Sequence, residues 1–355
     1  MATPQEILEE LKQIKYPGYS RDIVSFGIVR DIEIGSTGVT VTLAIGNAKA
    51  DAVDEISRAV RDRVRALVAG GTIEVVIQEP EKPKPAAAPR APGIPGVEQV
   101  IAVASGKGGV GKSTVAVNLA LALQKLGKRV GLLDADVYGP SIPLMLGLDE
   151  RPQSSERERI VPLERYGLKA ISLGSFIQPG QPVIWRGPMI TKLLTQFLYE
   201  VEWGTLDLLV LDLPPGTGDA QLTITQQAPL AGGVIVTTPQ DVALLDVQRG
   251  ITMFQQVNAP VLGVVENMSF HVCTGCGDRA EIFGHGGGHR MADDLKIPFL
   301  GEIPLVRLIR EGMDRGTPVV VDAPASPETE AFMSVARGVL DQLVQRGAMR
   351  LPTVH

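Results

Sequence analysis

The stretch Ala104–Thr114, ASGKGGVGKST, decides the fold. Gly106 to Ser113 fits the pattern G-x-x-x-x-G-K-[ST], a loop whose backbone N–H groups surround the phosphates of a nucleotide. It follows the apolar run QVIAVA and opens the helical segment KSTVAVNLALALQKLG. Because such a loop requires a strand before it and a helix after it, the context predicts a nucleotide-binding P-loop rather than an ordinary glycine-rich turn.

The loop also supplies the residues expected to bind ATP and Mg²⁺. Lys112 is placed to reach the β and γ phosphates, and Ser113 to coordinate Mg²⁺. The other positions expected to line the phosphates are Gly106, Lys107, Gly108, Gly109, Val110, Gly111 and Thr114.

Aspartates follow two other apolar runs. LVLDLPPGTGD ends its run at Asp212, where a carboxylate would hold Mg²⁺ or its water. LLDADVYGPS places Asp134 and Asp136 at a similar end, where they would orient the attacking water or the metal shell. A single aspartate could equally cap a helix. Three aspartates at the predicted ends of strands favour a catalytic role over helix capping. Lys112 is expected to belong to the same catalytic group.

The pattern of elements predicts an α/β fold for residues 97–355. Short β-branched runs alternate with helical segments: VIAVA, RVGLLDAD, LDLLVLDLPP, GGVIVTTP and PVLGVVENM. Continuous apolar strands separated by helices are typical of a mostly parallel sheet covered by helices on both faces. Ligands of such folds bind beyond the carboxyl ends of the strands, where the polar motifs occur.

Residues 1–78 predict a separate small α+β domain. Thr3–Glu6 has the form of a capping box that begins a helix. Two alternating runs, VRDIEI and VTVTLAI, flank residues 35–38 and predict a hairpin, and a helix from Val53 to Leu67 precedes the strand TIEVVIQ. Residues 79–96 contain six prolines and predict an extended tether.

The composition excludes several classes of protein. The 355 residues carry a net charge of -6, so the chain has no general electrostatic affinity for nucleic acid. No run approaches the roughly 18 to 20 apolar residues that span a bilayer, and the first residues lack the features of a secretion signal. We therefore expect a cytoplasmic protein with neither nucleic acid nor membrane as a partner.

The loop SGKGGVGKS resembles the deviant phosphate loop of the MinD/ParA/nitrogenase iron-protein superfamily. In that superfamily the extra lysine reaches across a dimer interface to the partner's nucleotide. The resemblance implies a homodimer in which Lys107 is catalytic in trans. The alternative is that Lys107 occupies a variable position of an ordinary loop.

Further motifs narrow the resemblance. LLDADVYGPS, WRGPM (Trp185–Met189), DLPPGTGD, ENMS (Glu266–Ser269) and a Cys-x-x-Cys resemble the Mrp/ApbC-type iron-sulfur cluster carrier ATPases, over residues 97 to at least 321. The resemblance implies that Asn267 contacts the adenine. A capping role is the alternative for this asparagine.

Cys273 and Cys276 are the only cysteines, and they lie in HVCTGCGDRAEIFGHGGGHR. An iron-sulfur cluster commonly takes four thiolates, so a four-cysteine cluster requires two chains. The family resemblance implies one [4Fe-4S] cluster shared across a homodimer interface. The alternatives are zinc bound with His285 and His289, although eight intervening residues are fewer than the usual 12 to 15, and a redox pair.

The first domain resembles a small domain of iron-sulfur assembly proteins, through RDIVSFGIVRDIEI. Many relatives have a cysteine after the second strand, but this chain has Gly46–Asp51 there, so docking to a partner is expected rather than ligation. The whole chain is expected to be an ATP-dependent carrier that transfers its cluster to apoproteins. Cluster scaffold proteins are a candidate source, which the sequence does not decide. The alternatives are a MinD/ParA-type positioning or partitioning ATPase and an ATP-coupled electron donor.

Overall fold

The computed structural model divides the chain into two units, Met1–Ala86 and Ala87–His355. Most of the predicted tether, residues 79–90, lies outside the described part of the chain, as do residues 45–49, 185–186 and 217 of the sequence motifs. The described residues are 3–15, 22–25, 28–35, 38–44, 50–68, 71–78, 91–136, 139–176, 187–216, 218–273 and 275–347.

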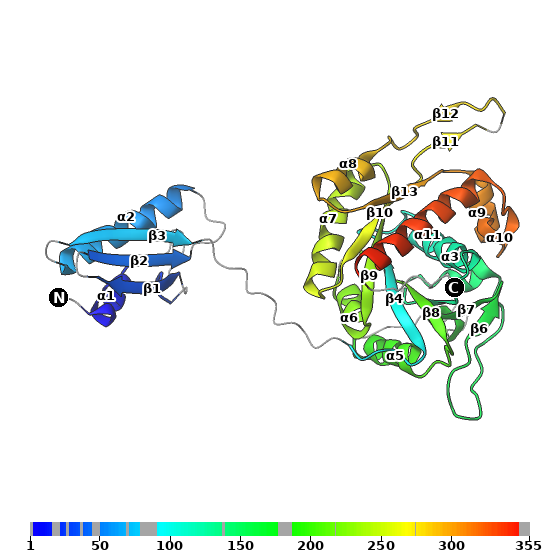
Figure 1. The fold of residues 1–355 in the computed structure, drawn as a ribbon, viewed down its shortest axis with the longest axis horizontal. Helices are drawn as coiled ribbons and strands as arrows, with labels where there is room; N and C mark the ends of the chain where they lie inside the picture. Colours follow the sequence, from blue (N-terminus) through cyan, green and yellow to red (C-terminus); the bar gives the residue numbers. More distant parts are fainter. Residues whose placement is uncertain are drawn as a thin grey trace, which may run out of the picture. The chain divides into compact units, whose positions relative to one another are not determined.

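The smaller unit packs two helices on a three-stranded sheet of order β1-β2-β3 (Figure 1). The predicted capping box begins the first helix, since the Thr3 side chain accepts from the backbone of Glu6 and the Glu6 side chain accepts from the backbone of Thr3. β1 and β2 form the predicted antiparallel hairpin, and β3 is parallel to β2. The elements are α1 (Pro4–Leu11), β1 (Val29–Ile34), β2 (Gly38–Ala44), α2 (Ala50–Leu67) and β3 (Thr72–Gln78).

The larger unit is built on an eight-stranded sheet of order β13-β10-β9-β4-β8-β5-β7-β6 (Figure 1). Every pairing is parallel except that of β6 with β7. The predicted mostly parallel sheet is therefore confirmed. Its strands are β4 (Val97–Ala104), β5 (Val130–Asp134), β6 (Leu163–Arg165), β7 (Leu168–Ser172), β8 (Leu206–Asp212), β9 (Leu230–Thr237), β10 (Val261–Asn267) and β13 (Phe299–Ile303).

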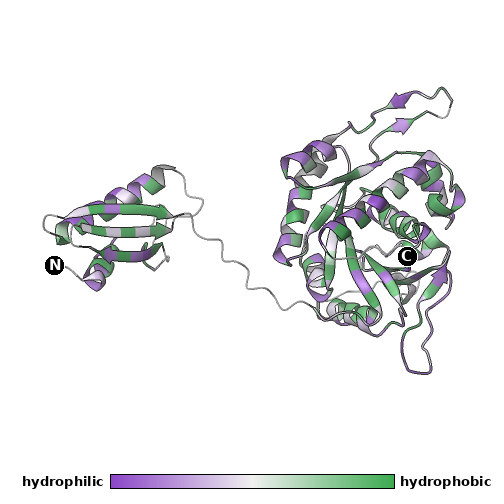
Figure 2. Ribbon diagram, viewed as in Figure 1, coloured by the Kyte–Doolittle hydropathy of each residue, from purple (hydrophilic) through white to green (hydrophobic). Residues whose placement is uncertain are grey.

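Helices cover both faces of this sheet, as the apolar strands predict. In β4, Ile101 and Val103 join one apolar core, which includes residues of α3 and α11, whereas Val100 and Ala102 join a second core, which includes residues of α5 to α7. Figure 2 shows the central strands as predominantly hydrophobic. The helices are α3 (Lys112–Lys125), α4 (Ile142–Leu146), the 3₁₀ turn η1 (Leu173–Phe176), α5 (Gly187–Tyr199), α6 (Asp219–Gln227), α7 (Asp241–Gln256), α8 (Gly287–Asp294), α9 (Arg307–Asp314), α10 (Val319–Asp322) and α11 (Pro327–Gln345).

A short antiparallel hairpin, β11 (His271–Val272) and β12 (Arg279–Ala280), extends away from the sheet (Figure 1). We call residues 271–280 the cysteine hairpin, because its turn carries both cysteines. In the part of the chain that is described, no helix combines the length and the apolar character needed to cross a membrane.

Candidate nucleotide site and cysteine hairpin

The P-loop joins the end of β4 to the start of α3. Gly109 and Gly111 have φ angles of +81° and +80°, a left-handed conformation that favours glycine. At Gly111 an added Cβ would also lie 2.2 Å from the Nδ2 atom of Asn267. The loop borders a cavity of about 200 Å³, whose lining includes Lys107, Lys112 and Asp136. The structure thus brings both lysines of the motif to one cavity.

Lys112 lies between carboxylates from two strand ends. Its side chain is 6% exposed, and its Nζ lies 2.5 Å from Asp212 Oδ1 and 3.7 Å from Asp136 Oδ2. Nζ also lies 3.3 Å from the Ser113 hydroxyl. Burying a charge is costly unless it is paired, so the aspartates and Lys112 hold one another in place. Four residues predicted from three motifs, Lys112, Ser113, Asp136 and Asp212, are therefore neighbours.

The oxygen atoms around Lys112 fit a magnesium site. Asp212 is fully buried, and among the described residues its Oδ2 atom has no hydrogen-bond partner. Such an atom is costly to bury unless it gains a ligand. Mg²⁺ prefers carboxylate and hydroxyl oxygens, which Asp212 and Ser113 supply beside the phosphate loop. The donor set is consistent with the roles expected for these residues.

Asp134 is held at the end of β5. Its carboxylate accepts hydrogen bonds from the Ser172 hydroxyl at 2.8 Å and from the backbone N–H groups of Asp136 and Ile142 at 3.1 and 3.3 Å. Burial, together with the nearby Asp212 charge, raises the pKa of Asp134 to about 7. Burial also raises the pKa of Asp212, although Lys112 opposes that shift. The site therefore favours a proton on Asp134 below neutral pH.

This proton predicts how stability depends on pH. The ordinary pKa of Asp134 is 3.8, so between about pH 4 and pH 7 the folded protein holds a proton that the unfolded chain has released. We therefore expect the free energy of unfolding of the nucleotide-free protein to fall, relative to that of Asp134→Asn, by up to about 1.4 kcal/mol per pH unit as pH rises through this window. Urea unfolding at several pH values measures this. A difference in unfolding free energy between the two proteins that stays constant across this pH window would contradict the prediction.

Asn267 ends β10 beside the P-loop. Its side chain is buried, and Nδ2 donates to the backbone carbonyl of Val110 at 2.8 Å. The structure thus assigns this amide a hydrogen bond to the loop itself. Contact with the purine stays a prediction.

Both cysteines lie in the turn of the cysteine hairpin. The backbone N–H of Cys273 donates to the backbone carbonyl of Asp278, and the backbone N–H of Gly277 donates to the carbonyl of Cys273, each at 2.8 Å. Gly277 has a φ angle of +75°. The N–H groups of Cys276 and Gly275 point at the Cys273 sulfur and lower its pKa. Both thiols are free, and Cys276 is exposed. Thiolates are the form that binds metals, so the turn favours ligation.

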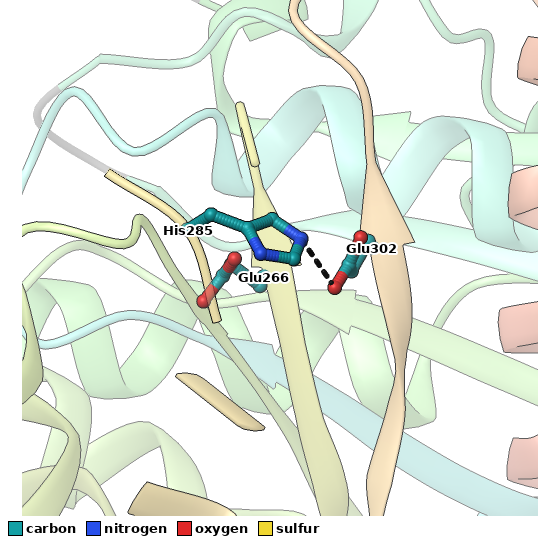
Figure 3. A group of neighbouring side chains, drawn as sticks. All are labelled: Glu266, His285 and Glu302. Carbon is teal, nitrogen blue, oxygen red and sulfur yellow. Dashed lines mark ion pairs between the residues drawn. The ribbon is translucent and has the colours of Figure 1, made fainter. Parts of the chain in front are cut away.

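The zinc alternative does not fit this geometry. His285 Nε2 pairs with Glu302 at 2.9 Å, and His289 Nδ1 pairs with Asp293 at 3.3 Å. Within the described residues, the one cluster with the spacing of a metal site contains Glu266, His285 and Glu302 and neither cysteine (Figure 3). His285 lies beside β13 at the edge of the sheet, so the two cysteines and two histidines of the zinc alternative are not gathered at one site.

Comparison with known proteins identifies the family. The family described as NUBPL iron-transfer P-loop NTPase (ParA) matches residues 96–340. A protein from Synechocystis sp. named iron-sulfur cluster carrier protein is 44% identical over 344 residues, which cover 96% of this chain and 97% of that protein. This chain belongs to the iron-sulfur cluster carrier family. The resemblance drawn from the motifs is therefore confirmed.

Other comparisons agree with membership of the carrier family. The family described as iron-sulfur cluster assembly protein matches residues 4–75, within the smaller unit. A nucleotide-binding protein from Archaeoglobus fulgidus, solved with ADP, is 41% identical with a TM-score of 0.59, covering 67% of this chain and 92% of that one. The cell-division ATPase MinD of Pyrococcus furiosus, 23% identical with a TM-score of 0.53 and covering 69% and 99% of the two chains, shows the shared P-loop fold alone.

Some residues of this carrier's site were not singled out from the sequence. Ser172 binds Asp134, and Met145 and Pro215 line the phosphate cavity, although none belongs to the P-loop pattern. In the sequence, Glu266 stands out only as the first residue of the motif ENMS. Its partners lie up to 22 residues away along the chain, so only the folded structure identifies them.

Proposed function

We propose that this iron-sulfur cluster carrier holds a [4Fe-4S] cluster between two copies of the chain and transfers it to apoproteins under the control of ATP. The observation that carries the proposal is the cysteine hairpin, which presents Cys273 and Cys276 in a projecting turn (Figure 1). Two thiolates from each copy complete the four ligands that such a cluster commonly takes. Because half of the ligands belong to each copy, separation of the copies would release the cluster.

ATP is proposed to bind in the P-loop cavity with Mg²⁺. In this proposal Lys112 binds phosphate oxygens, Ser113 and Asp212 hold Mg²⁺, and Asp134 and Asp136 orient water and the metal shell. The buried ion pair between Lys112 and Asp212 supports this proposal. Phosphate would compete for Lys112 and Mg²⁺ for Asp212, so binding of the nucleotide would replace the ion pair. Loops that sense such a change commonly rearrange on hydrolysis.

Lys107 is proposed to act on the nucleotide of the partner copy. The half-buried side chain lines the phosphate cavity without belonging to the ordinary P-loop signature. We expect Lys107→Ala to keep its affinity for ADP and to lose about 100-fold in ATP hydrolysis, because a preorganised charge acts mainly on the transition state. Calorimetric titration and phosphate release measure the two effects. Equal losses of binding and of hydrolysis would instead indicate an ordinary phosphate contact within one chain.

Cluster transfer to an apoprotein tests the whole proposal. The anaerobically reconstituted protein is mixed with an apoenzyme whose activity requires a [4Fe-4S] cluster, with and without ATP and Mg²⁺. We expect transfer to depend on nucleotide in the wild-type chain and to lose that dependence in Lys107→Ala. Transfer at one rate under all these conditions would contradict control by ATP. Retention of the cluster while it cycles its redox state would instead support the electron-donor alternative.

A further inference from the structure

Glu266 is a buried carboxylate that binds both ends of the segment carrying the cysteines. Its side chain is 0% exposed. Oε1 accepts from the Ser269 hydroxyl at 2.6 Å and from the backbone N–H of Gly286 at 3.0 Å, and Oε2 accepts from the backbone N–H of Gly288 at 2.5 Å. Ser269 precedes β11 and Gly286 follows β12, so one carboxylate closes the segment that contains both cysteines. We call Glu266 and these three donors the carboxylate clasp.

The next residue of the same strand binds the P-loop. Asn267 donates to the carbonyl of Val110 at 2.8 Å, and it lies so close to Gly111 that no Cβ fits there. Successive side chains of a strand point to opposite faces. The end of β10 therefore contacts the phosphate loop through one residue and the carboxylate clasp through its neighbour.

The short link between β10 and the cysteine hairpin is hydrogen-bonded to the end of β13 and to the residues after it. The N–H of Ser269 donates to Ile303 at 3.0 Å, and the N–H of Leu305 donates to Phe270 at 2.7 Å. His271 Nδ1 lies 2.8 Å from the carbonyl of Leu305. Because Ser269, Phe270 and His271 are hydrogen-bonded to the end of β13 and the residues after it, we expect a shift at the end of β10 to move the hairpin.

An arginine lies among the charged groups beside the clasp. Arg279 Nη2, from β12, lies 2.8 Å from His285 Nε2 and 3.6 Å from Glu302. The same guanidinium lies 3.8 Å over the ring of Phe270. Although Glu266, His285 and Glu302 approach one another (Figure 3), the arginine supplies a positive charge at this place. The cluster is therefore better explained as an anchor for the hairpin base than as a cation site.

We propose that Glu266 is a positioning residue that couples the P-loop to the cysteine hairpin through the carboxylate clasp. Occupation of the P-loop acts on Asn267, the end of β10 transmits the change, and the clasp sets the positions of both cysteines. This inference rests on the proposed function, in which the nucleotide controls the cluster ligands. It assigns the connection between the P-loop and the two cysteines to the side chain of Glu266.

Replacement of Glu266 by glutamine isolates the clasp with little change of shape. Each carboxylate oxygen accepts from a backbone N–H, so in either orientation the new NH₂ group faces a donor that cannot turn away. Ser269→Ala is milder, because it removes one donor and leaves both backbone bonds. The matched control is Glu281→Gln, since its side chain is 52% exposed on the same segment and lies 3.7 Å from His285 but contacts no group of the clasp.

The test measures alkylation of Cys273 and Cys276 in the metal-free, full-length protein, with and without ADP and Mg²⁺. We expect the nucleotide to change the rate in the wild-type chain and in Glu281→Gln. In Glu266→Gln we expect alkylation to be about fivefold to tenfold faster, because loss of one buried hydrogen bond makes opening of the hairpin more favourable by about that factor. We also expect the rate to be the same with and without nucleotide. Ser269→Ala should show a smaller effect in the same direction.

Binding of ADP, titrated on the same samples, separates coupling from unfolding. Unchanged ADP affinity in Glu266→Gln, together with loss of the nucleotide response, supports the proposal. A wild-type response retained in Glu266→Gln, or no response in the wild-type chain, would overturn it. The assay contains no cluster, so failure of the protein to bind iron would defeat the proposed function without changing this result.

Discussion

Replacement of Lys112 by alanine is expected to abolish nucleotide binding and to lower the free energy of unfolding by about 3 kcal/mol. The stability effect follows from burial. The lysine is 6% exposed and lies 2.5 Å from Asp212, which is 0% exposed, so its removal leaves a buried carboxylate without its positive partner. The loss of binding is expected because Lys112, at the start of α3, holds the position of the loop pattern that reaches the β and γ phosphates, whereas Lys107 lines the cavity from the variable part of the loop.

Titration with ADP and Mg²⁺ and unfolding in urea measure the two effects of Lys112→Ala. Lys125→Ala is the matched control, because Lys125 is an exposed lysine in the last turn of the same helix. ADP affinity equal to that of the control protein would contradict the assignment of the phosphate site. Equal stability of the two variants would contradict the importance of the buried ion pair.

Replacement of Cys273 by alanine is expected to remove nearly all bound iron. In a homodimer the substitution takes away two of the four thiolates at once, and the remaining two cannot hold a cluster that commonly needs four. Iron and sulfide are quantified after anaerobic reconstitution. His289→Ala is the control, because this histidine pairs with Asp293 and is not a cluster ligand in this account. Iron lost in His289→Ala and retained in Cys273→Ala would reverse the assignment.

Local patterns predicted much of the fold. The capping box at Thr3 begins α1, because both of its hydrogen bonds lie within a few residues of one another. The apolar runs form parallel strands, since residues buried on both faces of a sheet need not alternate in polarity. The P-loop pattern placed Lys112 at the start of α3, because strand, loop and helix are contiguous in sequence.

The rest depends on contacts between distant parts of the chain. Lys112 and Asp212 are 100 residues apart in the sequence. Their motifs therefore predicted a phosphate-binding role and a Mg²⁺-binding role, but not the direct ion pair between the two side chains. The two cysteines and the nearby histidines made a zinc site possible. In the structure, the segment after β12 places His285 beside β13, where Glu302 is its partner. The carboxylate clasp was not predictable, since a lone glutamate in a strand carries no local signal of its buried donors.

Native mass spectrometry of the anaerobically reconstituted full-length protein tests directly whether two chains share one cluster. We expect one [4Fe-4S] cluster bound to two chains, and loss of both the cluster and the iron-dependent dimer in Cys273→Ala. A metal ion bound to a single chain, unchanged by that substitution, would contradict a cluster shared through the cysteine hairpins.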